Sequence, residues 1–184
     1  VLPPSFRLDS VAAFDAGSRP PSVVVADFNG DGAPDLAVPN VSTHRVTLLF
    51  QDEGGSFGGA FSALTGFGPV SVAAADLDRN GSQDLVVANS LSDSISVLIN
   101  PGTGRFLGGL NLAAGERPAA VATADLDGDG EIDVVCANEA SSTVSVFWNF
   151  GDGVLSVPMT LPAAASPVFV AIANVSGNGQ PEIL

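Results

Sequence analysis

The stretch ADFNGDGAPDLAVPN, residues 26–40, decides the fold of this chain because similar stretches recur along it at a fixed spacing. They are ADLDRNGSQDLVVAN at 75–89, ADLDGDGEIDVVCAN at 124–138 and the shorter ANVSGNGQPEIL at 173–184. Each copy begins 49 residues after the preceding one, without gaps. A period of this length indicates a repeat protein in which every unit has the same supersecondary structure.

Each repeat contains four short apolar runs separated by turns. The first run precedes the acidic stretch, the second follows it and the third alternates apolar with polar side chains; in the first unit these are 23–26, 36–38 and 46–50. The fourth run follows a Gly-rich turn and begins at Phe57, Phe106 and Leu155 in the three complete units. Four such runs predict one antiparallel sheet per unit. The first two runs are almost continuously apolar, so we expect both to be buried on both faces.

These repeats predict an all-β chain that folds as a β-propeller, in which four-stranded antiparallel blades of 49 residues stack around an axis. About four blades are represented: the units are about 20–68, 69–117 and 118–166, with a partial unit at 167–184, and residues 1–19 would supply the outer strand of a neighbouring or closing blade. A β-sandwich has a similar number of strands but does not require a strict period. We therefore expect residues 1–184 to form a single propeller domain or part of one. Because the chain ends at Leu184 inside a predicted strand, we expect further blades of the same chain or a homo-oligomer to complete the ring.

The acidic residues are concentrated in the loop between the first and second runs. Twelve of the 20 Asp and Glu residues lie in the four copies of this loop. Counted from its first Asp, each complete loop has oxygen-bearing side chains at positions 1, 3, 5 and 9, Gly at position 6, and a backbone carbonyl to offer at position 7. Ca²⁺ takes about six to eight hard oxygen ligands and uses the same 1-3-5 spacing in EF-hand loops, whereas Mg²⁺ requires a tighter octahedron. The alternative is that Asp, Asn and Gly only form solvated turns, but three matching copies favour a cation site.

The sequence thus predicts about three Ca²⁺ sites and a weak fourth. The expected ligands are Asp27, Asn29, Asp31, Ala33 and Asp35 in the first loop, Asp76, Asp78, Asn80, Ser82 and Asp84 in the second, and Asp125, Asp127, Asp129, Glu131 and Asp133 in the third. The fourth loop has a single carboxylate, so we expect it to bind weakly or to be empty. Its candidate ligands are Asn174, Ser176, Asn178 and Glu182.

The pattern Asp-x-Asx-Gly-Asp-Gly-x-x-Asp-Leu-x-Val, as found at 26–40 and 124–138, resembles the FG-GAP (VCBS-type) repeat of integrin-α-like β-propellers. This resemblance covers nearly the whole chain. It implies propeller blades stabilised by Ca²⁺, commonly in secreted or cell-surface proteins. The second loop departs from the pattern at Arg79-Asn80-Gly81-Ser82, and the fourth loop departs further.

Composition excludes several classes of function. The net charge of -14 repels phosphates, so we expect no nucleic-acid partner, while 46% hydrophobic residues argue against disorder. The uncharged segment 153–180 contains three prolines, so we expect no membrane insertion. A single histidine, His44, and the absence of hydrolase, zinc-protease or phosphate-loop motifs indicate that the chain is not an enzyme. We expect His44 to be a surface turn residue and Cys136 to be buried, whereas Trp148, with Phe147 and Phe150, is a candidate either for packing or for binding a ligand.

The function predicted from the sequence is a non-catalytic, calcium-binding module that is extracellular or on the cell surface, or periplasmic, because modest sites need the higher Ca²⁺ concentration found there. It would engage a protein or carbohydrate in adhesion through turns that differ between blades, at 41–45, 91–94 and 139–143. The alternatives are a structural subunit of a larger secreted assembly and an accessory domain of an extracellular enzyme. The absence of Lys, with abundant Ala, Gly and Val, suggests a bacterial source.

Overall fold

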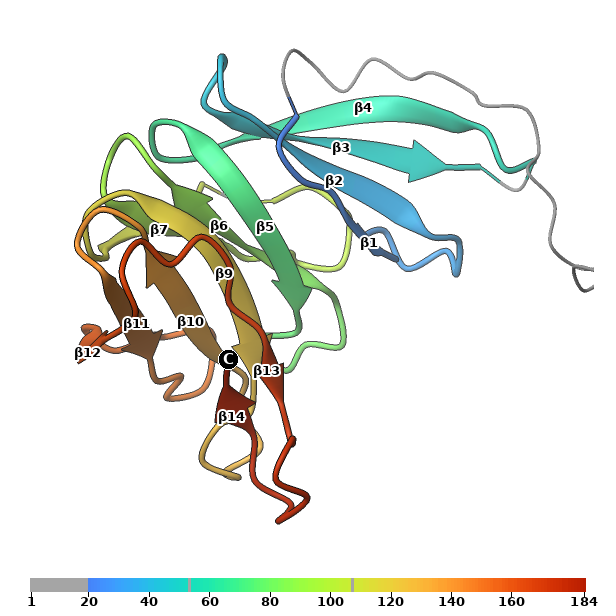
Figure 1. Ribbon diagram of the computed structural model, residues 1–184. Coiled ribbons are helices and arrows are strands. Elements are labelled where there is room, and N and C mark those ends of the chain that lie inside the picture. Colours follow the sequence, from blue (N-terminus) through green and yellow to red (C-terminus); the bar gives the residue numbers. More distant parts are fainter. Residues whose placement is uncertain (1–19, 53, 107) are drawn as a thin grey trace, which may run out of the picture.

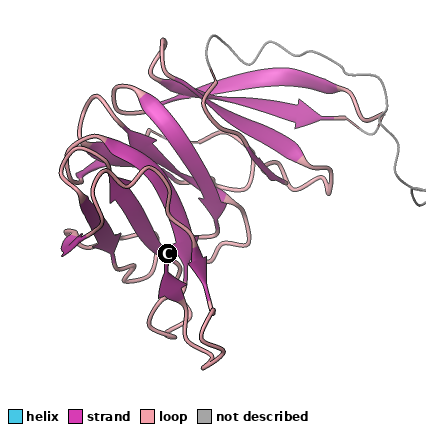
Figure 2. Cartoon of the chain, in the orientation of Figure 1, coloured by secondary structure: helices cyan, strands magenta, loops and turns pink. Residues whose placement is uncertain are grey.

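All regular elements in the described part of the chain are β-strands (Figure 1, Figure 2). The structure is a computed structural model that describes residues 20–52, 54–106 and 108–184. In chain order the strands are β1 (Val24–Ala26), β2 (Asp35–Asn40), β3 (Arg45–Gln51), β4 (Phe57–Leu64), β5 (Pro69–Ala75), β6 (Asp84–Asn89), β7 (Ser94–Leu98), β8 (Leu110–Ala113), β9 (Pro118–Ala124), β10 (Asp133–Asn138), β11 (Thr143–Phe147), β12 (Met159–Pro162), β13 (Ile172–Ala173) and β14 (Glu182–Ile183). None of the described residues forms a helix long and apolar enough to cross a membrane.

The strands form three four-stranded antiparallel sheets and one two-stranded sheet. Within each sheet the strands pair in chain order: β1-β2-β3-β4, β5-β6-β7-β8, β9-β10-β11-β12 and β13-β14. Neighbouring sheets stack with their first strands in contact, β1 against β5, β5 against β9 and β9 against β13 (Figure 1). The predicted all-β architecture of four-stranded propeller blades is thereby confirmed, with three complete blades and two strands of a fourth.

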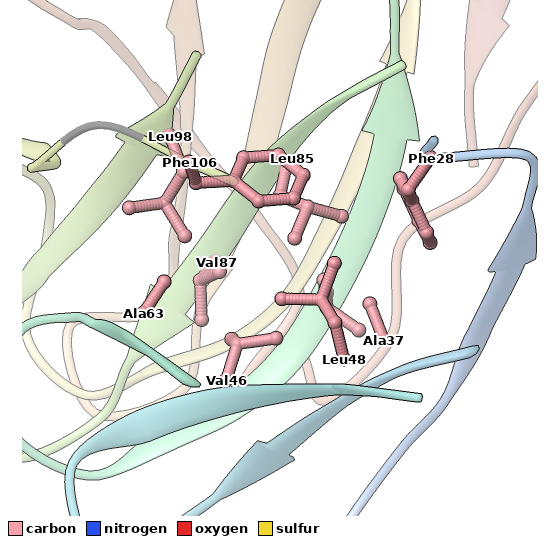
Figure 3. Packing of buried hydrophobic residues seen from close by; sticks show 10 residues of the cluster. Phe28, Ala37, Val46, Leu48, Ala63, Leu85, Val87, Leu98 and Phe106 are labelled. Atoms are coloured by element: carbon pink, nitrogen blue, oxygen red, sulfur yellow. The ribbon is translucent and has the colours of Figure 1, made fainter. Parts of the chain in front are cut away.

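Apolar side chains fill the space between successive blades. Val46 and Leu48 of β3 meet Leu85 and Val87 of β6 in the cluster between the first two blades, which Figure 3 shows. The alternate residues of β6 point to the other face and join the cluster between the second and third blades. The middle of a strand that lies between two other sheets, such as β6, therefore has apolar residues on both faces. Each large aliphatic side chain buried in this way stabilises the stack by about 1.5–3 kcal/mol.

The first strand of each blade is less buried than the sequence predicted. Val25 in β1 is 57% exposed, whereas every residue of β6 and β10 is buried. A first strand is the edge of its sheet and packs mainly against the next first strand, so part of its surface stays open. The expectation of burial on both faces is therefore wrong for the first run and correct for the second run of the second and third blades.

The fourth strands of the second and third blades begin four residues after the positions at which the sequence predicted them to start. Phe106 and Leu155 lie in the segments before β8 and β12 and are buried between blades. Leu155 forms only an isolated bridge, with Asn149, and is not part of β12. Phe106 packs edge-to-face against Phe28 of the first acidic loop, with ring centroids 5.9 Å apart. The outer strand predicted within residues 1–19 lies outside the described residues.

Candidate metal centre

Each acidic loop joins the first two strands of a blade and is closed by the same backbone pairing. The residue before the loop pairs with position 9 in all four copies: Ala26 with Asp35, Ala75 with Asp84, Ala124 with Asp133 and Ala173 with Glu182. Position 6 has a φ between 85° and 88° in every copy, and it is occupied by Gly32, Gly81, Gly130 and Gly179. Glycine adopts this left-handed conformation without a steric penalty, so it lets the loop reverse direction.

The Asp at position 1 holds the turn from inside. Asp27 accepts hydrogen bonds from the backbone N–H groups of Gly30 (2.7 Å) and Gly32 (2.8 Å), and the third loop repeats both bonds at 2.7 and 2.9 Å. In the second loop Arg79 replaces the Gly at position 4 with a φ of 58°, and Asp76 accepts from the N–H groups at positions 5 and 6. All three loops therefore direct backbone dipoles at the position 1 carboxylate.

The Asp at position 9 is buried and uses both of its oxygens. Asp84 is fully buried and accepts from the N–H of Leu77 at 2.8 Å and of Asn100 at 2.7 Å. Asp35 and Asp133 accept from the equivalent two N–H groups of their own blades at 2.9–3.0 Å. Position 9 therefore connects its loop to the end of the third strand of the same blade, in addition to any bond to a cation.

Three carboxylates meet in the second loop and again in the third. Asp76, Asp78 and Asp84 each place a carboxylate oxygen within 4.8 Å of the other two. The equivalent group in the third loop is Asp125, Asp127 and Asp133. In the first loop position 3 is Asn29, whose amide oxygen accepts from the N–H of position 5 at 3.0 Å, as the carboxylate at this position does in the other two loops. The structure thus brings together predicted ligands at positions 1, 3 and 9.

The crowding of these carboxylates is electrostatically unfavourable. Burial raises the pKa of Asp84 to about 6, against the opposing effect of its two backbone hydrogen bonds, and the negative charges of Asp78 and Asp76 raise it further. Burial likewise raises the pKa of Asp133. A cation placed among these oxygens would remove this penalty. The donors are all hard oxygens, which suit Ca²⁺ better than a transition metal, and Ca²⁺ accepts a less regular geometry than Mg²⁺ does.

Positions 5 and 7 are arranged differently from positions 1, 3 and 9. The side-chain oxygen at position 5 accepts from the N–H of position 7 at 2.7–2.8 Å in each complete loop, in Asp31, Asn80 and Asp129. Asp129 is not part of the third-loop carboxylate group. The side chain of Glu131 at position 7 forms an ion pair with Arg79 of the second loop, at 2.8 Å. Coordination through positions 5 and 7 stays a prediction.

The fourth loop repeats three hydrogen bonds of the other loops with mostly neutral groups. Asn174 accepts from Gly177 at 2.8 Å, Asn178 accepts from Gln180 at 2.7 Å, and Glu182 accepts from the N–H of Val175 at 2.7 Å. The hydroxyl of Ser176 also donates to Glu182, and this bond is the main cause of the lowered pKa of Glu182. The turn therefore forms with a single carboxylate, and its low affinity for a cation stays a prediction.

The other residues singled out in the sequence, apart from Phe150, are buried or pack against neighbouring residues. His44 lies half-buried in the turn between β2 and β3, where its Nδ1 accepts from the N–H of Gly68 at 3.1 Å and its ring meets Phe67 edge-on. Cys136 is fully buried. Trp148 packs against the cluster between the third blade and β13–β14, Phe147 is buried, and Phe150 is 73% exposed.

Two buried asparagines beside the loops were not identified from the sequence. Asn100 and Asn149 follow the third strands of the second and third blades, and both amides donate to the loop of the preceding blade. Their spacing of 49 residues was a signal that could have found them.

A model of the FG-GAP-like repeat matches residues 27–87, 78–136 and 125–184. No curated protein matches the sequence.

Several solved structures match this chain at low sequence identity. A functionally unknown protein from Desulfotomaculum acetoxidans is 22% identical with a TM-score of 0.58, over 80% of this chain and 44% of that chain. BBS1N, in its complex with ARL6DN, is 13% identical with a TM-score of 0.59, over 86% of this chain and 48% of that chain. The V. cholerae biofilm matrix protein Bap1 is 23% identical with a TM-score of 0.49, over 88% of this chain and 27% of that chain. The chain spans less than half the length of each.

Proposed function

This chain belongs to the FG-GAP-like repeat family, and we propose that it is a non-catalytic β-propeller module whose acidic loops bind Ca²⁺ outside the cell. The observation that carries the proposal is the carboxylate group at positions 1, 3 and 9, which recurs in the second and third loops. A catalytic pair of carboxylates would be needed once, whereas a structural cation is needed in every blade. The bound ion would neutralise the loop and fix the first two strands of the blade.

The proposed ligands are the oxygens at positions 1, 3, 5 and 9 and the carbonyl at position 7 of three loops, with the fourth loop weak or empty. Each ion that binds only the folded state stabilises it by about 2.7 kcal/mol when its free concentration is about 100 times Kd. Extracellular modules bind Ca²⁺ at about 10⁻⁴–10⁻³ M, which suits the cell surface, the extracellular space or the periplasm.

Calorimetric titration of the chelator-treated chain tests the calcium proposal. We expect about three Ca²⁺ to bind and the melting temperature to rise when Ca²⁺ replaces EGTA. The matched control is Mg²⁺ at the same concentration, which should raise the melting temperature less. An identical melt in EGTA and in about 10 mM Ca²⁺, well above the usual affinity of extracellular modules, would refute a structural calcium role.

We further propose that a protein or carbohydrate binds at the rim opposite the acidic loops. Because the strands are antiparallel, the turns between second and third strands lie at that rim. A groove there, between the first and second blades, is lined by polar side chains and one aromatic ring, with Thr65, Phe67, Ser92, Asp93, Ser94 and Asn111 contributing. Phe67 is 61% exposed. The aromatic face and surrounding hydroxyl, amide and carboxylate groups suit a polar ligand with an apolar face.

An array of oligosaccharides, together with a panel of purified extracellular glycoproteins, would test this rim. Binding of the ligand should depend on Ca²⁺ indirectly, because the ion stabilises the folded blades. Phe67→Ala should weaken this binding. Phe150→Ala is the control, because Phe150 is also exposed (73%) but lies in the loop between β11 and β12. Equal loss of binding in both variants would argue against the groove, and the absence of any binder would favour the role of a structural subunit in a secreted assembly.

A further inference from the structure

Asn100 connects the acidic loops of the first two blades. It is fully buried just after β7. Its backbone N–H donates to Asp84 at position 9 of the second loop, at 2.7 Å, while its side-chain amide donates to the carbonyl of Phe28 at position 2 of the first loop, also at 2.7 Å. The amide donates its second proton to the carbonyl of Gln83 at 3.1 Å. One residue thus contacts two different predicted cation loops.

Asn149 repeats this arrangement one blade further along. It is 2% exposed, its N–H donates to Asp133 in the third loop at 2.9 Å, and its amide donates to the carbonyl of Leu77 in the second loop at 2.9 Å. The second amide proton again goes to the blade's own loop, to the carbonyl of Ile132 at 3.1 Å. The two asparagines therefore connect the first loop to the second and the second to the third.

The link continues through each loop to its position 9 carboxylate. Phe28 offers its carbonyl to Asn100, and its N–H donates to Asp35 at 3.0 Å; Leu77 does the same with Asn149 and Asp84, at 2.8 Å. Each connection from one position 9 carboxylate to the next passes through only two residues. Such buried and fully satisfied hydrogen-bond networks are stiff, so a shift at one end is transmitted to the other.

We propose that Asn100 and Asn149 are positioning residues that couple the cation sites of neighbouring blades, so that Ca²⁺ in one loop raises the affinity of the next; this rests on the proposed binding of Ca²⁺ in these loops. A cation that fixes one position 9 carboxylate orders the loop residue at position 2, the asparagine and the following carboxylate. The second ion then binds to a site that is already ordered. Couplings of this kind typically change affinity by about 5- to 150-fold, equally in both directions.

A second contact joins the second and third loops at the surface. Arg79 and Glu131 form their ion pair at 2.8 Å, with the Arg79 side chain 55% exposed and the Glu131 side chain 15% exposed. The guanidinium is largely in solvent, which screens its attraction to the carboxylate. Arg79→Ala therefore serves as the control: it breaks a contact between the same two loops without touching Asn149.

The experiment uses the full chain with Asp27→Ala, which disables the first loop and leaves the two carboxylate groups. Calorimetry with Ca²⁺ should then resolve two ions that bind with positive cooperativity, the second at least about 5-fold more tightly than independent sites allow. Adding Asn149→Ala should make the two sites independent, whereas adding Arg79→Ala should leave the cooperativity. Asn149→Gln, which keeps an amide, should restore part of it.

Each outcome is informative. Two Ca²⁺ ions that bind independently while Asn149 is present would overturn the coupling but not the proposed function, and this measurement needs no asparagine variant to fold. Cooperativity that survives in folded Asn149→Ala would overturn the assignment to Asn149. No Ca²⁺ bound at up to about 10 mM, well above the usual affinity of extracellular modules, would overturn the proposed function, and the coupling with it.

Discussion

Replacing Asp84 by Ala separates the hydrogen-bonding role that the structure gives to position 9 from its proposed role as a cation ligand. Asp84 accepts hydrogen bonds from Leu77 and Asn100 within a buried site, and Ala would leave both N–H groups without an acceptor. An unsatisfied buried donor costs about 1–3 kcal/mol, so the two together cost about 2–6 kcal/mol. For a chain of this length, each kcal/mol shifts the melting temperature by about 2–4 °C. We therefore expect Asp84→Ala to melt about 4–24 °C lower than the parent chain in EGTA.

Asp78→Ala is the matched comparison, because Asp78 belongs to the same carboxylate group but is only half-buried. Among the described residues, its oxygens accept hydrogen bonds only from Asn80 of its own loop, at 3.1–3.2 Å. Its removal should leave the melt in EGTA almost unchanged. In saturating Ca²⁺ both variants should lose the stabilisation supplied by the second site, about 2.7 kcal/mol at about 100 times Kd.

Differential scanning calorimetry of the parent and both variants, each in EGTA and in Ca²⁺, gives all of these values. The reasoning would be refuted if the two variants melted at the same temperature in EGTA, since position 9 would then have no role beyond the metal. It would also be refuted if Asp78→Ala kept the full response to Ca²⁺.

Three further predictions concern positions away from the carboxylates. Gly115→Ala should destabilise the fold by about 1–3 kcal/mol, because the new Cβ would lie 2.6 Å from the amide of Asn138 and from the hydroxyl of Ser141. Gly108→Ala is the control, since its Cβ would meet nothing within 4 Å, and it should leave the free energy of unfolding in urea nearly unchanged. His44→Ala should lower the free energy of unfolding by about 1 kcal/mol, because the N–H of Gly68 loses its acceptor. His44→Asp should retain this stability, since Asp93 accepts the equivalent N–H at 2.8 Å one repeat later. The midpoints of urea denaturation of the two variants test this prediction. Burial raises the pKa of Cys136 to about 12, so a thiol reagent should label it at neutral pH only after unfolding, and rapid labelling of the native chain would contradict its burial.

The 49-residue period was sufficient to predict the blades because each strand is specified locally. The apolar runs, the glycines with positive φ and the acidic loops are all read within one repeat, and they recur in the structure at the same register. In the second and third loops the predicted ligand positions 1, 3 and 9 converge for the same reason, because the residue before each loop pairs with position 9 and closes the loop. The chemistry of a single loop is therefore legible from fifteen residues of sequence.

Burial depends on what covers a strand, so the sequence of the first run in each repeat predicts more burial than the structure shows. β1, β5 and β9 are apolar enough for an interior, but each is the edge of its own sheet. Phe106 and Leu155 show the same limit, since their sequence positions suit a strand while the gap between two blades determines their place. These features follow from how neighbouring sheets stack, which the sequence of one repeat does not describe.

The contacts of Asn100 and Asn149 depend both on the repeat within the sequence and on the stacking of the blades. Each amide bonds to a carbonyl 72 residues earlier, a separation of one full repeat and nearly half of another. The period dictates that if one of these bonds forms, the other forms as well, because both partners shift by 49 residues together. It does not supply the first bond, which depends on the angle and offset between adjacent blades. A repeat sequence thus determines how often a contact between units occurs, while the stacking of the blades determines which residues make it. The proposed coupling of calcium sites depends on the stacking.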